Sequence, residues 1–220
     1  MPSPNKPVLA LVGGTGPEGR GLAKRFSLAG YQVIIGSRSP ERAQDVAAEL
    51  SSGEYSVRGT GNMDAARQAD IILLTIPYSA VDGTLPLISD HSRGKVVVSA
   101  IAPIEFRDGR PVALRPEAGS VAQEVAEKLP EAVVASAFQN VDARALASGR
   151  DVDMDVIVTS DDPEARHRVM DLVAALPGAR ALSGGRLAGS RYVEEITALL
   201  ITLNRIYKTH SGIRITGIQR

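Results

Sequence analysis

Short runs of apolar and β-branched residues alternate along this chain with longer stretches of helical spacing. The runs are typical of strands buried on both faces of a parallel sheet, and they occupy residues 8–13, 32–37, 71–77, 95–100, 132–138 and 155–161. The intervening stretches predict helices over 18–29, 40–50, 117–129 and 163–176, and a shorter one that Asn62 and Asp64 cap and that ends near Asp70. This alternation predicts an α/β fold of the Rossmann type, with a doubly wound, mostly parallel sheet.

The last pattern is a strong helix over 190–207, which forms a short C-terminal helical segment. Its apolar residues recur at i, i+3 and i+4 and are expected on one side: Val193, Ile196, Leu199, Leu200, Leu203, Ile206 and Tyr207. We predict a dinucleotide-binding Rossmann domain over 6–140. Residues 141–220 then form a substrate-side region that extends the same core.

Composition narrows the range of functions. Lys and Arg number 25 and Asp and Glu number 25, so no basic field favours nucleic acid or a membrane surface. The chain has no Cys, which excludes disulfides and thiolate chemistry. Its start does not read as a signal peptide, and no apolar run reaches the roughly 18 residues of a membrane helix. We expect a cytoplasmic protein that acts on a small molecule.

A glycine-rich turn joins the first strand to the first helix and predicts a dinucleotide site. In Gly14-x-Gly16-x-x-Gly19 the first glycine permits a tight bend, the second lets backbone approach a pyrophosphate, and the third permits close helix packing. The helix start offers free N–H groups to an anion. We expect the turn residues to bind the cofactor: Gly14, Thr15, Gly16, Pro17, Glu18 and Gly19. The alternative is a set of ordinary turn glycines.

The end of the second strand indicates which dinucleotide binds. An NAD site usually places a carboxylate there, but this chain has Ser37 and Arg38, with Arg42 one helical turn later. A hydroxyl and a guanidinium suit a 2′-phosphate, and Thr15 can add a second hydroxyl. The pattern therefore predicts NADP rather than NAD, against the alternative of a solvated arginine pair at a helix start.

Four segments resemble the NADPH-dependent reductases of coenzyme F420, a deazaflavin hydride carrier. These are "LVGGTGPEGRGLA", "IIGSRSPERA", "LLTIPY" and "LNRIYKTHSGIRITG", and the likeness runs from about Val8 to Ile218. The resemblance implies a small Rossmann protein, a homodimer, that moves a hydride between NADPH and F420. It also implies cofactor contacts at the following residues: Thr15, Ser37, Arg38 and Arg42 at the 2′-phosphate, Thr75, Ile76 and Pro77 in the cofactor cleft, and Val141 and Ala143 near the nicotinamide.

Such a hydride transfer requires no catalytic side chain and no metal, because the two cofactors carry the reactivity and the protein orients them. The histidines fit this expectation, since they are scattered without metal-ligand spacing. His91 is expected in a loop and His167 on a solvated helix face. His210 follows the last helix and is either a substrate contact or a helix-end cation.

Substrate contacts are expected at the carboxyl ends of the strands. Tyr78 and Phe138 lie there and either cover a ring face or pack in the core. F420 carries a phosphate and a polyglutamate tail, and the bases that could receive them are Arg191, Lys208 and Arg214, unless these are solvated helix-end charges.

The second-substrate side also departs from the family pattern. Gln139 stands where many relatives carry His, and it cannot transfer a proton near neutral pH. Arg191 and Thr197 match family positions in the last helix. Glu195 replaces Ser of some members and would repel an anionic reduced deazaflavin unless Arg191 neutralises it.

Two other functions remain open on the sequence. One is an NADP-dependent reductase of an imine or small carbonyl compound, which would need a proton donor such as Tyr78 or Asp142. The other is a non-catalytic NADP-sensing protein that keeps the glycine turn and the "GSR" segment.

Overall fold

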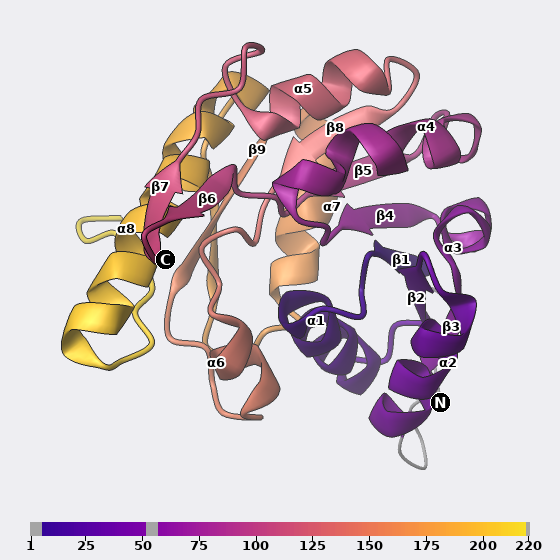
Figure 1. The fold of residues 1–220 in the computed structure, drawn as a ribbon, viewed down its shortest axis with the longest axis horizontal. Helices are drawn as coiled ribbons and strands as arrows, with labels where there is room; N and C mark the ends of the chain where they lie inside the picture. Colours follow the sequence, from indigo (N-terminus) through magenta and orange to yellow (C-terminus); the bar gives the residue numbers. More distant parts are fainter. Residues whose placement is uncertain (1–5, 52–56, 219–220) are drawn as a thin grey trace.

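The computed structural model describes residues 6–51 and 57–218, and within them eight strands form one sheet, in the order β10-β9-β8-β5-β4-β1-β2-β3 (Figure 1). The strands are β1 (Leu9–Val12), β2 (Val33–Ser37), β3 (Val57–Gly61), β4 (Ile71–Leu74), β5 (Val96–Ser99), β8 (Val133–Ser136), β9 (Asp155–Ser160) and β10 (Arg180–Ser183). The predicted α/β class with a mostly parallel sheet is confirmed. However, β9 runs antiparallel to β8, which corrects the expectation of a parallel strand at 155–161.

Helices cover both faces of the sheet and divide the core into two layers. Leu9 and Leu11 of β1 pack in one layer, and Ala10 and Val12 pack in the other. The first layer contains α1 (Pro17–Leu28), α2 (Pro40–Leu50), α6 (Ala143–Ala147) and α7 (Pro163–Val173). The second contains α3 (Asn62–Gln68), α4 (Val81–Ser92) and α5 (Val121–Lys128). Alternate side chains of each strand are therefore buried on opposite faces, as the continuous apolar runs require.

Several elements were not predicted. They are β3, β10, the helices α4 and α6, the hairpin of β6 (Ile104–Arg107) and β7 (Arg110–Ala113), and the 3₁₀ turns η1 (Tyr78–Ala80) and η2 (Leu187–Gly189). In α4, Gly83 and Pro86 argue locally against a helix, but Leu85 and Ile88 are fully buried and hold it against the sheet. His91 consequently lies in this helix, which corrects the expected loop position.

Two predicted helices differ from the structure. The helix expected from residue 117 begins only at Val121, because Gly119 adopts φ +98° and Ser120 caps the helix by accepting from Gln123 N at 3.1 Å. The terminal helix α8 (Ser190–Tyr207) has the predicted bounds. Its apolar residues do not share one buried side, since Val193 and Leu200 are buried whereas Leu199, Ile206 and Tyr207 are exposed.

Candidate functional site

The glycine turn lies where the strand order of the sheet reverses. Strand β1 pairs with β2 on one side and with β4 on the other, and all three are parallel. Their carboxyl ends therefore meet at one edge and diverge in their connections, which is where open α/β sheets bind ligands. The turn between β1 and α1 occupies this position (Figure 1).

The three predicted glycines differ in what surrounds them. A Cβ on Gly14 would lie 2.8 Å from Leu11 O, and one on Gly19 would lie 2.5 Å from Gly14 Cα, so both positions are needed for the backbone to pack. A Cβ on Gly16 would meet nothing closer than Gly13 O at 4.0 Å. The second glycine thus leaves open space above the turn, as a pyrophosphate site requires.

Gly13 and Asn62 complete the turn, although sequence reasoning assigned neither to it. Gly13 adopts φ +75°, and a Cβ there would lie 2.4 Å from Ile76 Cγ2. Its N–H donates to Asn62 Oδ1 at 3.1 Å. Gly61 is the N-cap of α3, so the expectation that Asn62 or Asp64 caps this helix is wrong. The doubled glycine was the available sequence signal; the contact with Asn62 was not predictable locally.

A cleft of about 210 Å³ opens from this turn toward the end of β2. The residues that line it come from the ends of β1, β2 and β4 and from the helices beside them: Gly13, Thr15, Gly16, Ser37, Arg38, Arg42, Asn62, Thr75, Ile76, Pro77, Ala80 and Thr84. The structure thus brings the predicted phosphate residues into one cleft with the predicted segment 75–77. Asn62, Ala80 and Thr84 are lining residues that the sequence did not reveal.

The two arginines of this cleft are available to an anion. Arg38 and Arg42 are exposed, and neither forms an ion pair within the described part of the chain. The nearby Glu41 carboxylate accepts from Ser39 Oγ at 2.8 Å, and hydrogen bonds from its own backbone N–H and from Ser39 lower its pKa. Ser37 Oγ accepts from Ser39 N at 3.2 Å, which fixes the hydroxyl at the strand end. The cleft therefore combines two guanidinium groups with the hydroxyls of Thr15 and Ser37, a donor set that fits a phosphate monoester.

A second crevice, of about 170 Å³, lies between the segment before α6 and helix α8. Its lining includes four predicted site residues, which are Gln139, Val141, Ala143 and Thr197. Gln139 Nε2 donates to Ser99 O at 2.9 Å and to Ser136 Oγ at 2.6 Å, while its buried Oε1 has no partner among the described residues. Thr197 Oγ1 donates to Val193 O at 3.1 Å and lies 3.2 Å from Gln139 O. Gln139 and Thr197, which were predicted to contact substrate, therefore already donate hydrogen bonds to the protein.

Neither candidate proton donor is suited to that role. Tyr78 Oη donates to Glu124 Oε2 at 3.0 Å, and burial together with Glu124 raises the pKa of Tyr78 to about 12. The Asp142 carboxylate caps α6 by accepting from Arg144 N at 2.8 Å and Ala145 N at 2.9 Å. His210 Nδ1 lies 3.3 Å from Asp142 Oδ2, at the mouth of a neighbouring hollow.

The expected anion-binding bases are arranged differently from the prediction. Arg191 lies over the Tyr192 ring at 5.0 Å, and the guanidinium nearest to Glu195 is Arg115, at 3.8 Å. Arg214 pairs with Asp155 at 2.9 Å and also contacts Asp153. The structure thus corrects two expectations. Glu195 pairs with Arg115 rather than with Arg191, and Arg214 is already paired with Asp155 and Asp153.

Lys208 and Phe138 have structural positions. Lys208 is the C-cap of α8 in the left-handed conformation, φ 51°, so of its two predicted roles the structure favours helix-end charge. Phe138 is fully buried and packs edge-to-face on Phe26 with ring centroids 6.1 Å apart. Its backbone has a positive φ of 76°, and of the two alternatives predicted for its ring the structure supports packing in the core.

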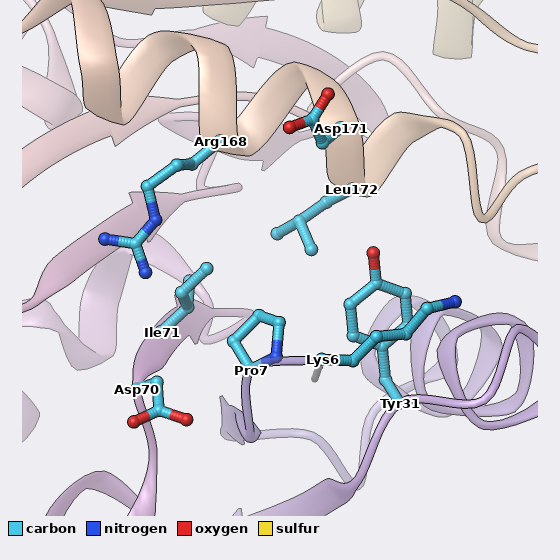
Figure 2. Close-up of a pocket in the computed structure, with 8 residues that line it drawn as sticks. All are labelled: Lys6, Pro7, Tyr31, Asp70, Ile71, Arg168, Asp171 and Leu172. Atoms are coloured by element: carbon cyan, nitrogen blue, oxygen red, sulfur yellow. The ribbon is translucent and has the colours of Figure 1, made fainter. Parts of the chain in front are cut away.

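A wider hollow of about 560 Å³ lies at the opposite end of the sheet (Figure 2). Residues that precede the strands line it, among them Lys6, Pro7, Tyr31 and Asp70, together with Arg168 and others from α7. Lys6 Nζ lies 4.6 Å from the Tyr31 ring centre, and Asp70 Oδ2 accepts from Val8 N at 2.8 Å. These contacts fix the start of β1, and the hollow lies at the amino ends of the strands, away from the glycine turn.

Comparisons with known proteins agree with this geometry. Residues 8–103 match the family model described as NADP oxidoreductase, coenzyme F420-dependent. An F420-dependent NADP reductase of Methanocaldococcus jannaschii is 39% identical over 96% of this chain and 99% of its own length. One of Methanothermobacter thermautotrophicus is 40% identical over 96% of this chain and 95% of its own length.

A solved structure extends the likeness to the fold. A protein of Arthrobacter sp. FB24, provisionally assigned as an F420-dependent NADP reductase, superposes with a TM-score of 0.84 over 96% of this chain and 100% of its own, at 22% identity. At that identity the match shows the architecture alone. Across residues 6–51 and 57–218, no helix combines the length and apolarity needed to cross a membrane.

Proposed function

The chain belongs to the coenzyme F420-dependent NADP oxidoreductase family, and from this premise we propose that it transfers a hydride between NADP(H) and coenzyme F420. The two cofactors supply the hydride chemistry, between a nicotinamide and a deazaflavin ring. The protein is an oxidoreductase that binds both and holds their rings in register.

One observation carries the NADP assignment: the cleft joins the open space above Gly16 to Arg38 and Arg42, which form no ion pair within the described residues. We propose that backbone N–H groups of the turn and the start of α1 bind the pyrophosphate. Ser37, Arg38, Arg42 and Thr15 then hold the 2′-phosphate. NAD would leave both guanidinium groups without an anion.

We further propose that Ile76 and Pro77 support the nicotinamide half and that Val141 and Ala143 bound the space it shares with the deazaflavin. The second crevice beside Thr197 supports this assignment, since it lies at the carboxyl edge of the sheet and is lined by both segments 139–143 and α8. In this arrangement Gln139 positions the segment through Ser99 and Ser136 rather than acting as an acid.

The reaction class is favoured over an imine or carbonyl reductase by the state of the candidate donors. Such an enzyme needs a proton donor beside the acceptor carbon, whereas Tyr78 is a very weak acid here and Asp142 is a helix cap. Transfer between two flat rings needs orientation and the exclusion of water more than an acid.

We also propose that the protein is a homodimer that works in the cytoplasm. An apolar face of α8 supports the dimer: Tyr192, Leu199, Ile206 and Tyr207 are all more than half exposed, as is Phe106 of the β6–β7 hairpin, whose strand β7 packs on α8. We also propose that residues 6–140 form the dinucleotide-binding domain and that residues 141–220 form the substrate-side region that extends its core.

The test is to mix the protein with NADPH and F420 and follow the absorbance of the oxidised deazaflavin. Loss of that band, with oxidation of one NADPH per F420, supports the proposed reaction. Tight NADPH binding with no bleaching of F420 would instead support the NADP-sensing alternative, and NADH supporting the reaction equally well would refute the NADP assignment.

A further inference from the structure

Three helices of this protein begin with the same dipeptide, Pro-Glu. They are α1 with Pro17 and Glu18, α2 with Pro40 and Glu41, and α7 with Pro163 and Glu164. A carboxylate in the first helical turn is normally solvated and stabilised by the helix dipole. Glu41 and Glu164 follow this rule, because both are exposed.

Glu18 breaks the rule, although its local sequence is the same. The residue is part-buried, and its Oε1 is shielded from solvent with no hydrogen-bond partner among the described residues. Such an orphaned carboxyl oxygen is uncommon, since buried polar groups are nearly always hydrogen-bonded. Its position beside the glycine turn therefore needs an explanation.

Glu18 lies on the face of α1 that packs against helix α6 (Figure 1). Glu18, Gly21 and Arg25 share one face of α1 at spacings of three and four. A Cβ on Gly21 would lie 2.6 Å from Leu146 Cβ, and Arg25 Nε donates to Leu146 O at 2.9 Å. Residues of α6 thus cover this face at Gly21 and Arg25, and Glu18 lies on it one turn earlier, beside the glycine turn.

Within residues 6–51 and 57–218, Glu18 forms no ion pair. On its own helix, Arg20 pairs with Glu49 of α2, Lys24 donates to Ala147 O, and Arg25 donates to backbone carbonyls of the α6 region. At the start of α6 the charged groups are Asp142, whose carboxylate caps that helix, and Arg144. Strands β1 and β2, which also pack on α1, carry no charged residue. Burial alone raises the pKa of Glu18 to about 8.

We propose that Glu18 is a cofactor-positioning residue, which as a neutral carboxylic acid donates a hydrogen bond to an oxygen of the dinucleotide bound at the glycine turn. The inference rests on the proposed function, because it requires NADP(H) in this cleft. A protonated carboxyl has one O–H donor, and it adds no negative charge next to a diphosphate. An ionised carboxylate at the same point would repel the ligand, and its Oε1 would stay shielded from solvent without a partner among the described residues.

Binding and protonation of this residue are then linked. If the dinucleotide binds the protonated form, its apparent affinity is constant below the pKa of Glu18 and falls as pH rises through about 8. Bound ligand in turn raises that pKa further. Glu41 and Glu164 produce no such effect, because both side chains are exposed to solvent.

The test is calorimetric titration with NADPH between about pH 7 and about pH 9.5, on the wild type, Glu18→Gln and the matched control Glu164→Gln. The wild type and Glu164→Gln should lose about thirtyfold in affinity over this interval. Glu18→Gln keeps an N–H donor but cannot ionise, so it should bind NADPH at about pH 7 within roughly threefold of wild type and change little with pH. A slope caused by any other group would survive in Glu18→Gln, and that result would overturn the proposal.

A second measurement needs no ligand and no activity. In protein with ¹³C-labelled glutamate carboxyls, the signal missing from Glu18→Gln identifies Glu18, and its titration should centre near 8 and shift upward with NADPH. A Glu18 signal that titrates in the ordinary range refutes the inference even if NADPH binds well. If the wild type binds no NADPH at about pH 7, the proposed function itself fails, which is a separate outcome.

Discussion

The cofactor cleft at the glycine turn and the crevice under α8 lie along the same edge of the sheet, but their polar groups are arranged differently. In the cleft, Arg38 and Arg42 have no ionic partner within the described residues. In the crevice, Gln139 and Thr197 already donate to the protein. The cleft thus offers positively charged groups to an anionic ligand, whereas the polar side chains of the crevice are held in place by hydrogen bonds within the protein. This difference suits a reaction in which the protein binds NADP(H) through its phosphates and only orients the nicotinamide and deazaflavin rings.

The strongest test of the comparison is Gly16→Val. The position has an extended backbone, φ −76° and ψ 169°, and open space around its Cβ, so valine is tolerated by the fold. The isopropyl group would occupy the site of the pyrophosphate, and NADPH affinity should fall roughly a thousandfold or more. Calorimetry gives the affinity, and a melting temperature within a few degrees of wild type shows that the domain is folded.

Gly19→Val is the matched control for that substitution. Its Cβ would lie 2.5 Å from Gly14 Cα, so the protein should lose stability rather than only its ligand. If Gly16→Val is folded and binds NADPH normally, the pyrophosphate does not lie over this turn.

The double variant Arg38→Ala/Arg42→Ala should have the next largest effect. Each charge-assisted contact contributes roughly 1.5–3 kcal/mol, so together they predict an affinity loss for NADPH of about 10² to 10⁴. Affinity for NADH, which lacks the 2′-phosphate, should hardly change. Arg168→Ala, an exposed arginine at the opposite end of the sheet (Figure 2), is the control. Equal losses for both dinucleotides would contradict the assignment of the 2′-phosphate.

The cleft was predictable from sequence because its main residues are local. The glycine turn and the end of β2 are formed within the first 42 residues, and each has a motif with a geometric reason. Asn62 was missed because it reaches Gly13 from a helix 49 residues away in sequence. Gln139 was predicted as a site residue, but its orientation was not, since Ser99 of β5 and Ser136 of β8 fix where its side chain points. A single sequence gives residue types at a site but not the partners that orient them.

The same distinction explains what was missed in the fold. Strands β1, β2, β4, β5, β8 and β9 are apolar runs and were predicted, whereas β3 and β10 lie at the two edges of the sheet and have few buried residues. Helix α4 contains Gly83 and Pro86 and is held by burial that only the assembled sheet supplies. Tertiary packing overrode local propensity in each case.

A third prediction concerns Glu194 of α8, the helix that lines the crevice, and tests whether this residue stabilises the fold without affecting ligand binding. This carboxyl is 1% exposed and accepts from Val121 N at 2.8 Å and Ala122 N at 3.1 Å, so it caps α5 from another helix. Glu194→Ala leaves both N–H groups buried without this partner and should cost about 2–3 kcal/mol of unfolding free energy. NADPH affinity should change less than about threefold. Glu195→Ala, whose side chain is 36% exposed, should cost well under half as much.

The pH dependence of stability sharpens this prediction. Burial outweighs the hydrogen bonds from Val121 and Ala122 and raises the pKa of Glu194 to about 6. Because the folded pKa is then above the unfolded one, the unfolded chain loses its proton first, and this residue's contribution to stability is lost as pH rises through about 6. The melting temperature of wild type relative to Glu194→Gln should therefore fall between about pH 4.5 and about pH 7. A constant difference would show that folding does not raise the pKa of Glu194.

The smallest effect is expected from Tyr78→Phe, and it bears most directly on the reaction class. The hydroxyl donates to Glu124 of α5, and its loss should change stability by no more than about 1 kcal/mol. If the cofactors alone carry the chemistry, the rate of F420 reduction at saturating NADPH should stay within about threefold of wild type. Stopped-flow absorbance measures this rate, with Glu124→Ala as the variant that removes the same contact from the other side. A fall of roughly a hundredfold confined to Tyr78→Phe would mean that this phenol delivers a proton, despite a pKa of about 12. The substrate side would then take part in the chemistry, and the contrast between a cleft that binds phosphates and a crevice that only orients the rings would no longer hold.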